Sequence, residues 1–185
     1  MSEPASESAA IDSIVAITTR WVERAVIGLN LCPFAKAVHA KGQIRYVVCP
    51  AITAEALLTA LMDELQLLAT TNPDDIETTL LIHPYALTDF LDFNDFLDTA
   101  DVTIAALKLE GAIQIASFHP QYQFAGTDTD DISNFTNRSP YPTLHLLREA
   151  SVTRAVAAFP NAGDIFEKNI ATMTTLGHAG WERLR

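Results

Sequence analysis

The sequence is poor in positive charge and has no long apolar run. Its 185 residues include 12 Lys and Arg against 23 Asp and Glu, which gives a formal net charge of −11. This charge opposes binding to nucleic acid or to an anionic membrane, and no basic run compensates for it. No apolar run approaches the ~20 residues of a membrane-spanning helix. We therefore expect neither nucleic acid nor a membrane as a partner.

Cysteine is also scarce, and familiar catalytic motifs are absent. The chain has two cysteines, and its small, polar start, MSEPASESAA, lacks the pattern of a secretory signal. We expect free thiols, a cytoplasmic location, a disordered tail over residues 1–11 and a single domain over residues 12–185. No Walker loop, Gly-x-Gly-x-x-Gly or His-Glu-x-x-His is present, so the common nucleotide and zinc-protease motifs are excluded.

Segments typical of helices and of strands alternate along the chain. Apolar residues at helical spacing predict helices near residues 12–29, 53–68 and 88–109, and β-branched runs predict strands over 44–49, 78–83 and 112–119. Two more helices are expected near 142–159 and 162–176. Because helices separate the strands, the strands are expected to be parallel. The prediction is one α/β domain, with a small three-stranded parallel sheet and helices on both faces.

Each predicted strand ends on a cysteine or histidine that a proline follows at once, at Cys49, His83 and His119. Parallel strands bring their carboxyl ends to one edge, where α/β proteins bind ligands. The alternation of side chains is expected to place His83 and His119 in one pocket, roughly 5 Å apart on neighbouring strands or roughly 10 Å with a strand between them. The competing interpretation is that proline ends each strand and the histidine is incidental.

Cys32 is a second candidate for chemistry. If Pro33 opens a short helix, the helix dipole and Lys36 would lower the pKa of the Cys32 thiol. Cys32 would then be a thiolate nucleophile or metal ligand, with His119 as acid/base or ligand and His83 as its partner. Neutral imidazoles and a thiolate suit a divalent transition metal such as zinc or iron, so these three residues are also the metal candidates. The alternative is a cysteine that only packs.

Residues 120–140 form a long polar loop that is rich in aromatic residues, and we expect it to fold over the strand ends. The segment after it is predicted to begin a helix near Pro142, whose free N–H groups would attract an anion. The residues expected to bind a small anionic molecule there are Asn137, Arg138, Ser139, His145 and Arg148. The alternative is that both arginines pair with acidic side chains.

Five segments together resemble a known family. They are WVERAVIGLNLCPFAKA, LLIHP, FLDFNDFLD, IQIASFHPQYQFAG and NRSPYPTLHLLREASVTRAV. The chain resembles the bacterial family of proteins known as domain of unknown function 1415, over nearly its whole length after the tail. The resemblance implies no reaction. Cys49, at the first strand end, lies outside these segments, which contain the other candidates: Cys32, His83, His119, Asn137, Arg138, Ser139, His145 and Arg148.

Two functions of different classes fit these patterns. One is an enzyme with a Cys/His pocket at the strand ends that acts on a small anionic substrate. The other is a non-catalytic module that binds a small molecule or a metal and has a regulatory role. Because one fold can serve both, the fold alone cannot choose between them, and we take the enzyme as the first hypothesis and the module as the alternative. Titratable side chains that converge in a closed, dry pocket would indicate the enzyme.

Overall fold

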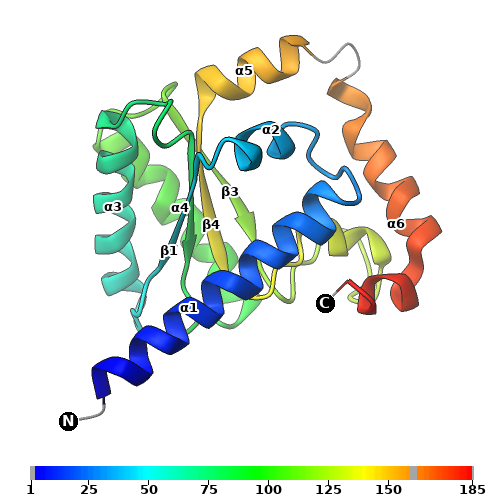
Figure 1. Cartoon of the computed structure of the whole chain (residues 1–185), viewed down its shortest axis with the longest axis horizontal. Coiled ribbons are helices and arrows are strands. Elements are labelled where there is room, and N and C mark those ends of the chain that lie inside the picture. Colours follow the sequence, from blue (N-terminus) through cyan, green and yellow to red (C-terminus); the bar gives the residue numbers. More distant parts are fainter. Residues whose placement is uncertain (1–2, 159–161, 185) are drawn as a thin grey trace.

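The fold is built on one mixed sheet. The computed structural model describes residues 3–158 and 162–184. In these residues the strands are β1 (Ile44–Val48), β2 (Thr78–Ile82), β3 (Ile113–Phe118) and β4 (Thr143–Arg148), in the order β1-β2-β4-β3 (Figure 1). β1 is parallel to β2, and β4 is antiparallel to both β2 and β3. The α/β class is confirmed, but the prediction of a three-stranded, wholly parallel sheet was wrong.

The strand that the prediction missed is β4, which had been assigned to the start of a helix. Its apolar residues Leu144, Leu146 and Leu147 fit helical spacing as well as a strand. The strand forms because β2 and β3 each offer an open edge, and β4 pairs with both along its length. Leu144 and Leu146 are fully buried on one face of the sheet as a result. Long-range pairing thus overrides local preference here.

The three predicted strands nevertheless run in one direction. β2 and β3 are both antiparallel to β4, so they point the same way, and β1 follows β2. The carboxyl ends of β1, β2 and β3 therefore meet at one edge, as the sequence predicted.

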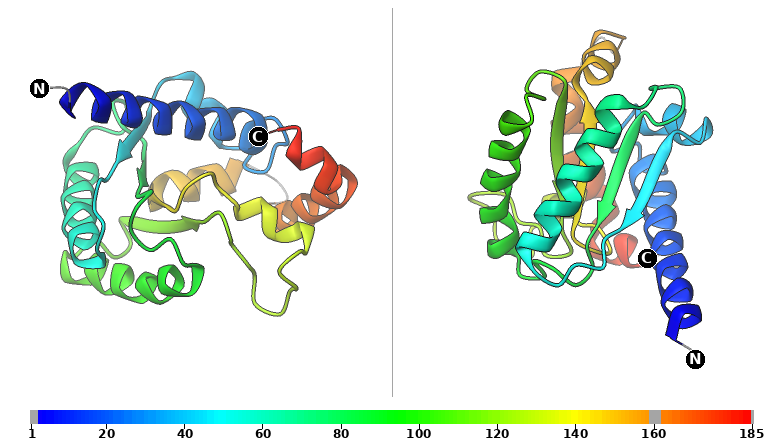
Figure 2. Two further views of the ribbon diagram at one scale, coloured as in Figure 1. Left: turned by 90° about the horizontal axis from the view of Figure 1, so that it is seen from below. Right: turned by 90° about the vertical axis from the view of Figure 1, so that its left-hand side faces the viewer.

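Helices cover both faces of the sheet, as expected (Figure 2). α3 (Ala54–Thr70) and α4 (Phe90–Ala106) pack on one face, which we call the α3/α4 face. Thr53 caps α3 by accepting a hydrogen bond from the Ala56 N–H, and the leucine stripe of α3 is fully buried. The opposite face, the α1/α6 face, carries α1 (Glu3–Trp21), the π-helix η1 (Val22–Ile27) and α6 (Ile165–Glu182).

The remaining elements are α2 (Ala35–Ala40), the 3-10 helices η2 (Ile132–Asn137) and η3 (Ala162–Asp164), and α5 (Glu149–Ala158). α5 is the later part of the helix predicted near 142–159, whose last residue lies outside the described ranges. α1 begins at Glu3, inside the segment predicted as a tail, and the division into a tail and one domain stays a prediction. Within the described ranges, no helix is long and apolar enough to span a membrane.

Candidate functional site

The strand ends form a single row across the sheet. The last pairs are Val48 with Ile82, and Thr143 with both Ile82 and Phe118. One position further on, the row reads Cys49, His83, Pro142 and His119. The Cys49 N–H donates to the Ile82 carbonyl at 2.7 Å, and the His83 N–H donates to the Pro142 carbonyl at 3.0 Å. β4 thus separates the two histidines, whose backbones are roughly 10 Å apart.

Both imidazoles lie on the α3/α4 face and pack against one aromatic ring. The centroid of the Phe93 ring is 5.7 Å from that of His83 and 5.1 Å from that of His119. Cys49 belongs to the same buried cluster as Phe93 and Ala86. Both histidines are 0% exposed. His83 and His119 thus share a face and an edge of the sheet, while the prediction that they line one pocket stays a prediction.

The hydrogen bonds of His83 fix its tautomer. Its Nδ1 lies 2.9 Å from the Ala86 carbonyl oxygen. A carbonyl can only accept, so Nδ1 carries the proton and Nε2 holds a free lone pair. Nε2 is buried and has no hydrogen-bond partner. Buried polar atoms almost always have hydrogen-bond partners, so this acceptor is the atom of the site at which we expect a ligand to bind.

His119 is different, because both of its ring nitrogens are engaged. The Gln121 N–H donates to Nδ1 at 3.0 Å, which places the proton on Nε2. Nε2 then donates to the Leu87 carbonyl at 3.3 Å. His119 can take a proton or bind a metal only by losing one of these bonds. The geometry therefore favours His83 as the reactive imidazole and His119 as the positioning residue, the reverse of the roles that the sequence suggested.

Burial keeps both imidazoles neutral. It lowers the pKa of His83 to about 4, although the hydrogen bond to the Ala86 carbonyl partly opposes the shift and nearby His119 adds to it. Burial also lowers the pKa of His119, and the Leu87 carbonyl and the Asp89 carboxylate oppose that shift. At neutral pH the lone pair of His83 is therefore available as a base.

Cys32 does not join the histidines. It lies in the turn between η1 and α2, and the N-cap of α2 is Phe34 rather than Cys32, so the predicted helix start at Pro33 was wrong. α2 leads directly into the beginning of β1, which places this turn at the opposite edge of the sheet from the strand ends (Figure 1). Cys32 is thus apart from His83 and His119, and its role as a nucleophile or ligand stays a prediction.

The metal candidates do not converge either. Over residues 3–158 and 162–184, no three His, Cys, Asp or Glu side chains are grouped so as to hold a metal ion. Of the three candidates, only His83 has a ring nitrogen free for a metal.

Asn137, Arg138 and Ser139 lie beside the end of β3. The Asn137 carbonyl accepts from the His119 N–H at 3.2 Å. The Arg138 guanidinium donates to the carbonyls of Tyr122 and Thr129 and lies 4.1 Å from the centre of the Phe135 ring. Burial lowers the pKa of Arg138, and the charge of Asp130 opposes this shift. Asp130 therefore balances part of the Arg138 charge, although no described carboxylate is in ion-pair contact with the guanidinium.

His145 lies elsewhere. It was expected to share a helix face with Arg148, but both are in β4, where residues three apart point to opposite faces. His145 Nε2 lies 2.7 Å from the Thr78 hydroxyl, which itself donates to the Leu146 carbonyl, so Nε2 is the donor. Burial lowers the pKa of His145 to about 4. This imidazole faces the α1/α6 face, away from His83.

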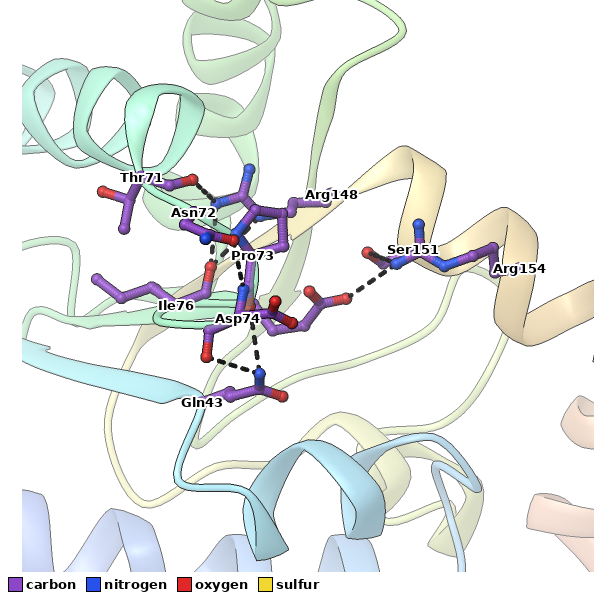
Figure 3. Close-up of polar contacts among 10 residues, drawn as sticks. Gln43, Thr71, Asn72, Pro73, Asp74, Ile76, Arg148, Ser151 and Arg154 are labelled. Carbon is purple, nitrogen blue, oxygen red and sulfur yellow. Dashed lines mark hydrogen bonds and ion pairs between the residues drawn. The ribbon is translucent and has the colours of Figure 1, made fainter.

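Arg148 lies at the far end of β4 and has a structural contact. Its guanidinium donates to the Thr71 carbonyl at 2.8 Å and to the Ile76 carbonyl at 3.0 Å (Figure 3). These bonds hold the turn that follows α3. Because β4 separates Arg138 from Arg148, the two arginines do not form one anion cradle, and the helix start that was expected between them is a strand. Anion binding by Asn137, Arg138 and Ser139 stays a prediction.

The long loop covers the strand ends in part. The ring of Tyr122 packs 5.3 Å from Phe90, which in turn packs against His119. Phe124 packs on Tyr122. Phe135 instead reaches the α1/α6 face and contacts Trp181. The loop thus closes the site with Tyr122 and anchors itself to α6 with Phe135.

Two residues of the site had no assigned role before the structure. Cys49 ends its strand just as the histidines do, and that shared pattern was the available clue. Phe93 sits in an apolar helix stripe, and nothing in its sequence context distinguishes it from other core residues.

A family model described as "Protein of unknown function (DUF1415)" matches residues 13–183. No curated protein and no solved structure matches the chain significantly.

Proposed function

Since the chain belongs to the DUF1415 family, whose function is unknown, we propose a function from the site itself. We propose that the strand-end row is the active site of an enzyme that transfers protons on a small anionic molecule. His83 is the base. One observation carries this proposal: the buried Nε2 of His83 has a free lone pair and no partner.

The state of His83 suits a base that works in a closed site. Its Nδ1–H is fixed on the Ala86 carbonyl, so Nε2 accepts a proton from a hydroxyl, an amide or a water molecule. With a pKa of about 4, the imidazole is neutral near pH 7 and returns the proton readily to a leaving group. His119 supports this arrangement by holding the Leu87 carbonyl, next to the turn that fixes His83.

Arg138 is the group that we assign to the substrate's negative charge. It follows Asn137 beside the end of β3, and its guanidinium has to leave the Phe135 ring to reach a substrate at His83. Because His83 and His119 are 0% exposed, a substrate enters only when the turn over residues 84–88 and Tyr122 move. A cytoplasmic, bacterial enzyme is the setting that we propose.

The test is a thermal-shift screen of small carboxylates and phosphates. A ligand of the site should raise the unfolding temperature of the wild-type chain and lose this effect in His83→Gln. The matched control is His145→Gln, which changes an equally shifted histidine on the other face and should preserve the effect. If every stabilising ligand acts equally on His83→Gln and the wild type, the proposal fails.

The second candidate function is a non-catalytic module that binds a small molecule or a divalent metal. The separation of the two histidines favours it, because β4 lies between them and their backbones are roughly 10 Å apart. Incubating a confirmed ligand with catalytic amounts of the protein separates the two candidates. Conversion of the ligand indicates the enzyme, and recovery of unchanged ligand indicates the module.

A further inference from the structure

Cys49 is the member of the strand-end row that has no part in the proposed function. It is a free thiol and 5% exposed. It stands one position beyond the Val48–Ile82 pair, directly beside His83 on the neighbouring strand. Side chains at paired positions on one face lie roughly 5 Å apart. Cys49 and the partners of His83, Ala86 and Phe93, belong to one buried cluster, so both side chains are on the same face.

The chemistry of the two groups is complementary. The S–H group of a thiol is a donor, and Nε2 of His83 is restricted to accepting. No hydrogen bond joins them in the closed structure, because Nε2 has no partner. Catalysis therefore requires a movement that brings the thiol to the lone pair. A cysteine that can pass its proton to an imidazole becomes a nucleophile.

We propose that Cys49 is the nucleophile of this site, that His83 is its base, and that the substrate is a small acyl compound, namely an ester or thioester. This inference rests on the proposed function and names its reaction class. The thiol proton moves to His83 Nε2 as the sulfur forms a bond to the acyl carbon. The bond from that carbon to the leaving alcohol or thiol breaks, and the leaving group takes the proton from Nε2. Water then releases the acid and restores the thiol.

Cys32 provides a matched comparison within the same chain. It is the only other cysteine, and it lies in the turn before α2, at the opposite edge of the sheet. Cys32 is more exposed than Cys49. Accessibility alone would therefore make Cys32 the more reactive thiol, whereas a partner imidazole would favour Cys49.

The experiment measures the alkylation rate of Cys49 by iodoacetamide at pH 7.5 in the Cys32→Ser chain. Adding His83→Gln should slow alkylation at least about tenfold, since general-base assistance is lost. Adding His145→Gln should leave the rate unchanged. Opening of the site by the substitution would speed alkylation, so it cannot imitate the expected slowing. A rate that is unchanged or faster in the His83→Gln chain overturns the proposal.

A second readout requires no His83 variant. A small activated ester, p-nitrophenyl acetate, should leave an acetyl group on Cys49 of the Cys32→Ser chain, mapped by mass spectrometry of its peptides. Cys49 that stays unmodified while the ester is consumed elsewhere or not at all overturns the nucleophile, even if the His83→Gln chain does not fold. The proposed function is tested separately: a ligand that requires His83 but is indifferent to Cys49→Ala leaves the acid/base site standing and removes only the nucleophile.

Discussion

Each face of the sheet carries a histidine whose pKa is lowered to about 4, and these two histidines differ in one respect. On the α3/α4 face, burial lowers the pKa of His83 to about 4. On the α1/α6 face, burial has the same effect on His145. Yet His145 donates to the Thr78 hydroxyl, while Nε2 of His83 has no partner. A shifted pKa therefore marks burial on both faces, and the two histidines differ in whether Nε2 has a partner.

The largest expected effect comes from emptying the core on either face. Phe93 and Met173 are both 0% exposed, Phe93 on the α3/α4 face and Met173 on the α1/α6 face. In urea unfolding, Phe93→Ala should lower the free energy of unfolding by about 3–5 kcal/mol, and Met173→Ala should lower it by about 2–5 kcal/mol. Only Phe93→Ala should also shift the ring signals of His83 and His119. Equal changes in both variants would contradict the division into two faces.

The next effect is on acid stability. The pKa of His83 is about 4 in the folded chain and 6.5 as its ordinary value. The unfolded chain thus binds more protons than the folded chain. The stability that neutral His83 contributes is therefore fully present above pH 6.5 and is lost as the pH falls toward 4. The His83 share is about 3 kcal/mol. In His83→Gln, the slope of the unfolding free energy against pH near pH 5 should fall by about 1 kcal/mol per pH unit. A slope equal to that of the wild type would show that His83 is not buried neutral.

A smaller effect is expected on the paired histidine. Thr78→Val removes the hydroxyl that accepts from His145 and donates to the Leu146 carbonyl. It should cost about 1–3 kcal/mol in urea unfolding, because it leaves buried polar groups without partners. The ring of His145 should then resemble that of His83 in having an unpartnered nitrogen. An unchanged free energy of unfolding would mean that the hydrogen bond between His145 and Thr78 does not stabilise the fold.

The smallest effect is expected at the loop. Arg138 ties the carbonyls of Tyr122 and Thr129 together, and Lys lacks its fork of donors. Arg138→Lys should lower stability by about 1 kcal/mol. Amide hydrogen exchange in residues 120–130 should become faster, while exchange in β2 stays unchanged. Unaltered exchange in the loop would show that Arg138 does not hold it.

Much of the framework could be predicted from local patterns, and the part that could not depends on distant pairing. The leucine stripe of α3 and the proline after each strand depend on residues close together in the sequence, so the helix and the strand ends could be predicted from them. β4 was not, since Thr143–Arg148 becomes a strand only between β2 and β3. The preference for Cys32 over Cys49 also came from a local pattern. It depended on a local helix start, whereas register places Cys49 beside His83.

The roles of the histidines also lay beyond the sequence. His83 and His119 have the same His-Pro context, and only their contacts distinguish them. Gln121 and Leu87 occupy both nitrogens of His119, and Ala86 occupies one of His83. Such contacts depend on the turns after each strand, whose conformations a residue pattern does not specify.

The central claim is that His83 keeps a free, unprotonated Nε2 in the closed protein. The most direct measurement is ¹⁵N NMR of the histidine side chains near pH 7, assigned with His83→Gln and His119→Gln. The account predicts that His83 is a neutral imidazole protonated at Nδ1 and His119 a neutral imidazole protonated at Nε2. A charged His83, or a His83 with its proton on Nε2, would contradict it.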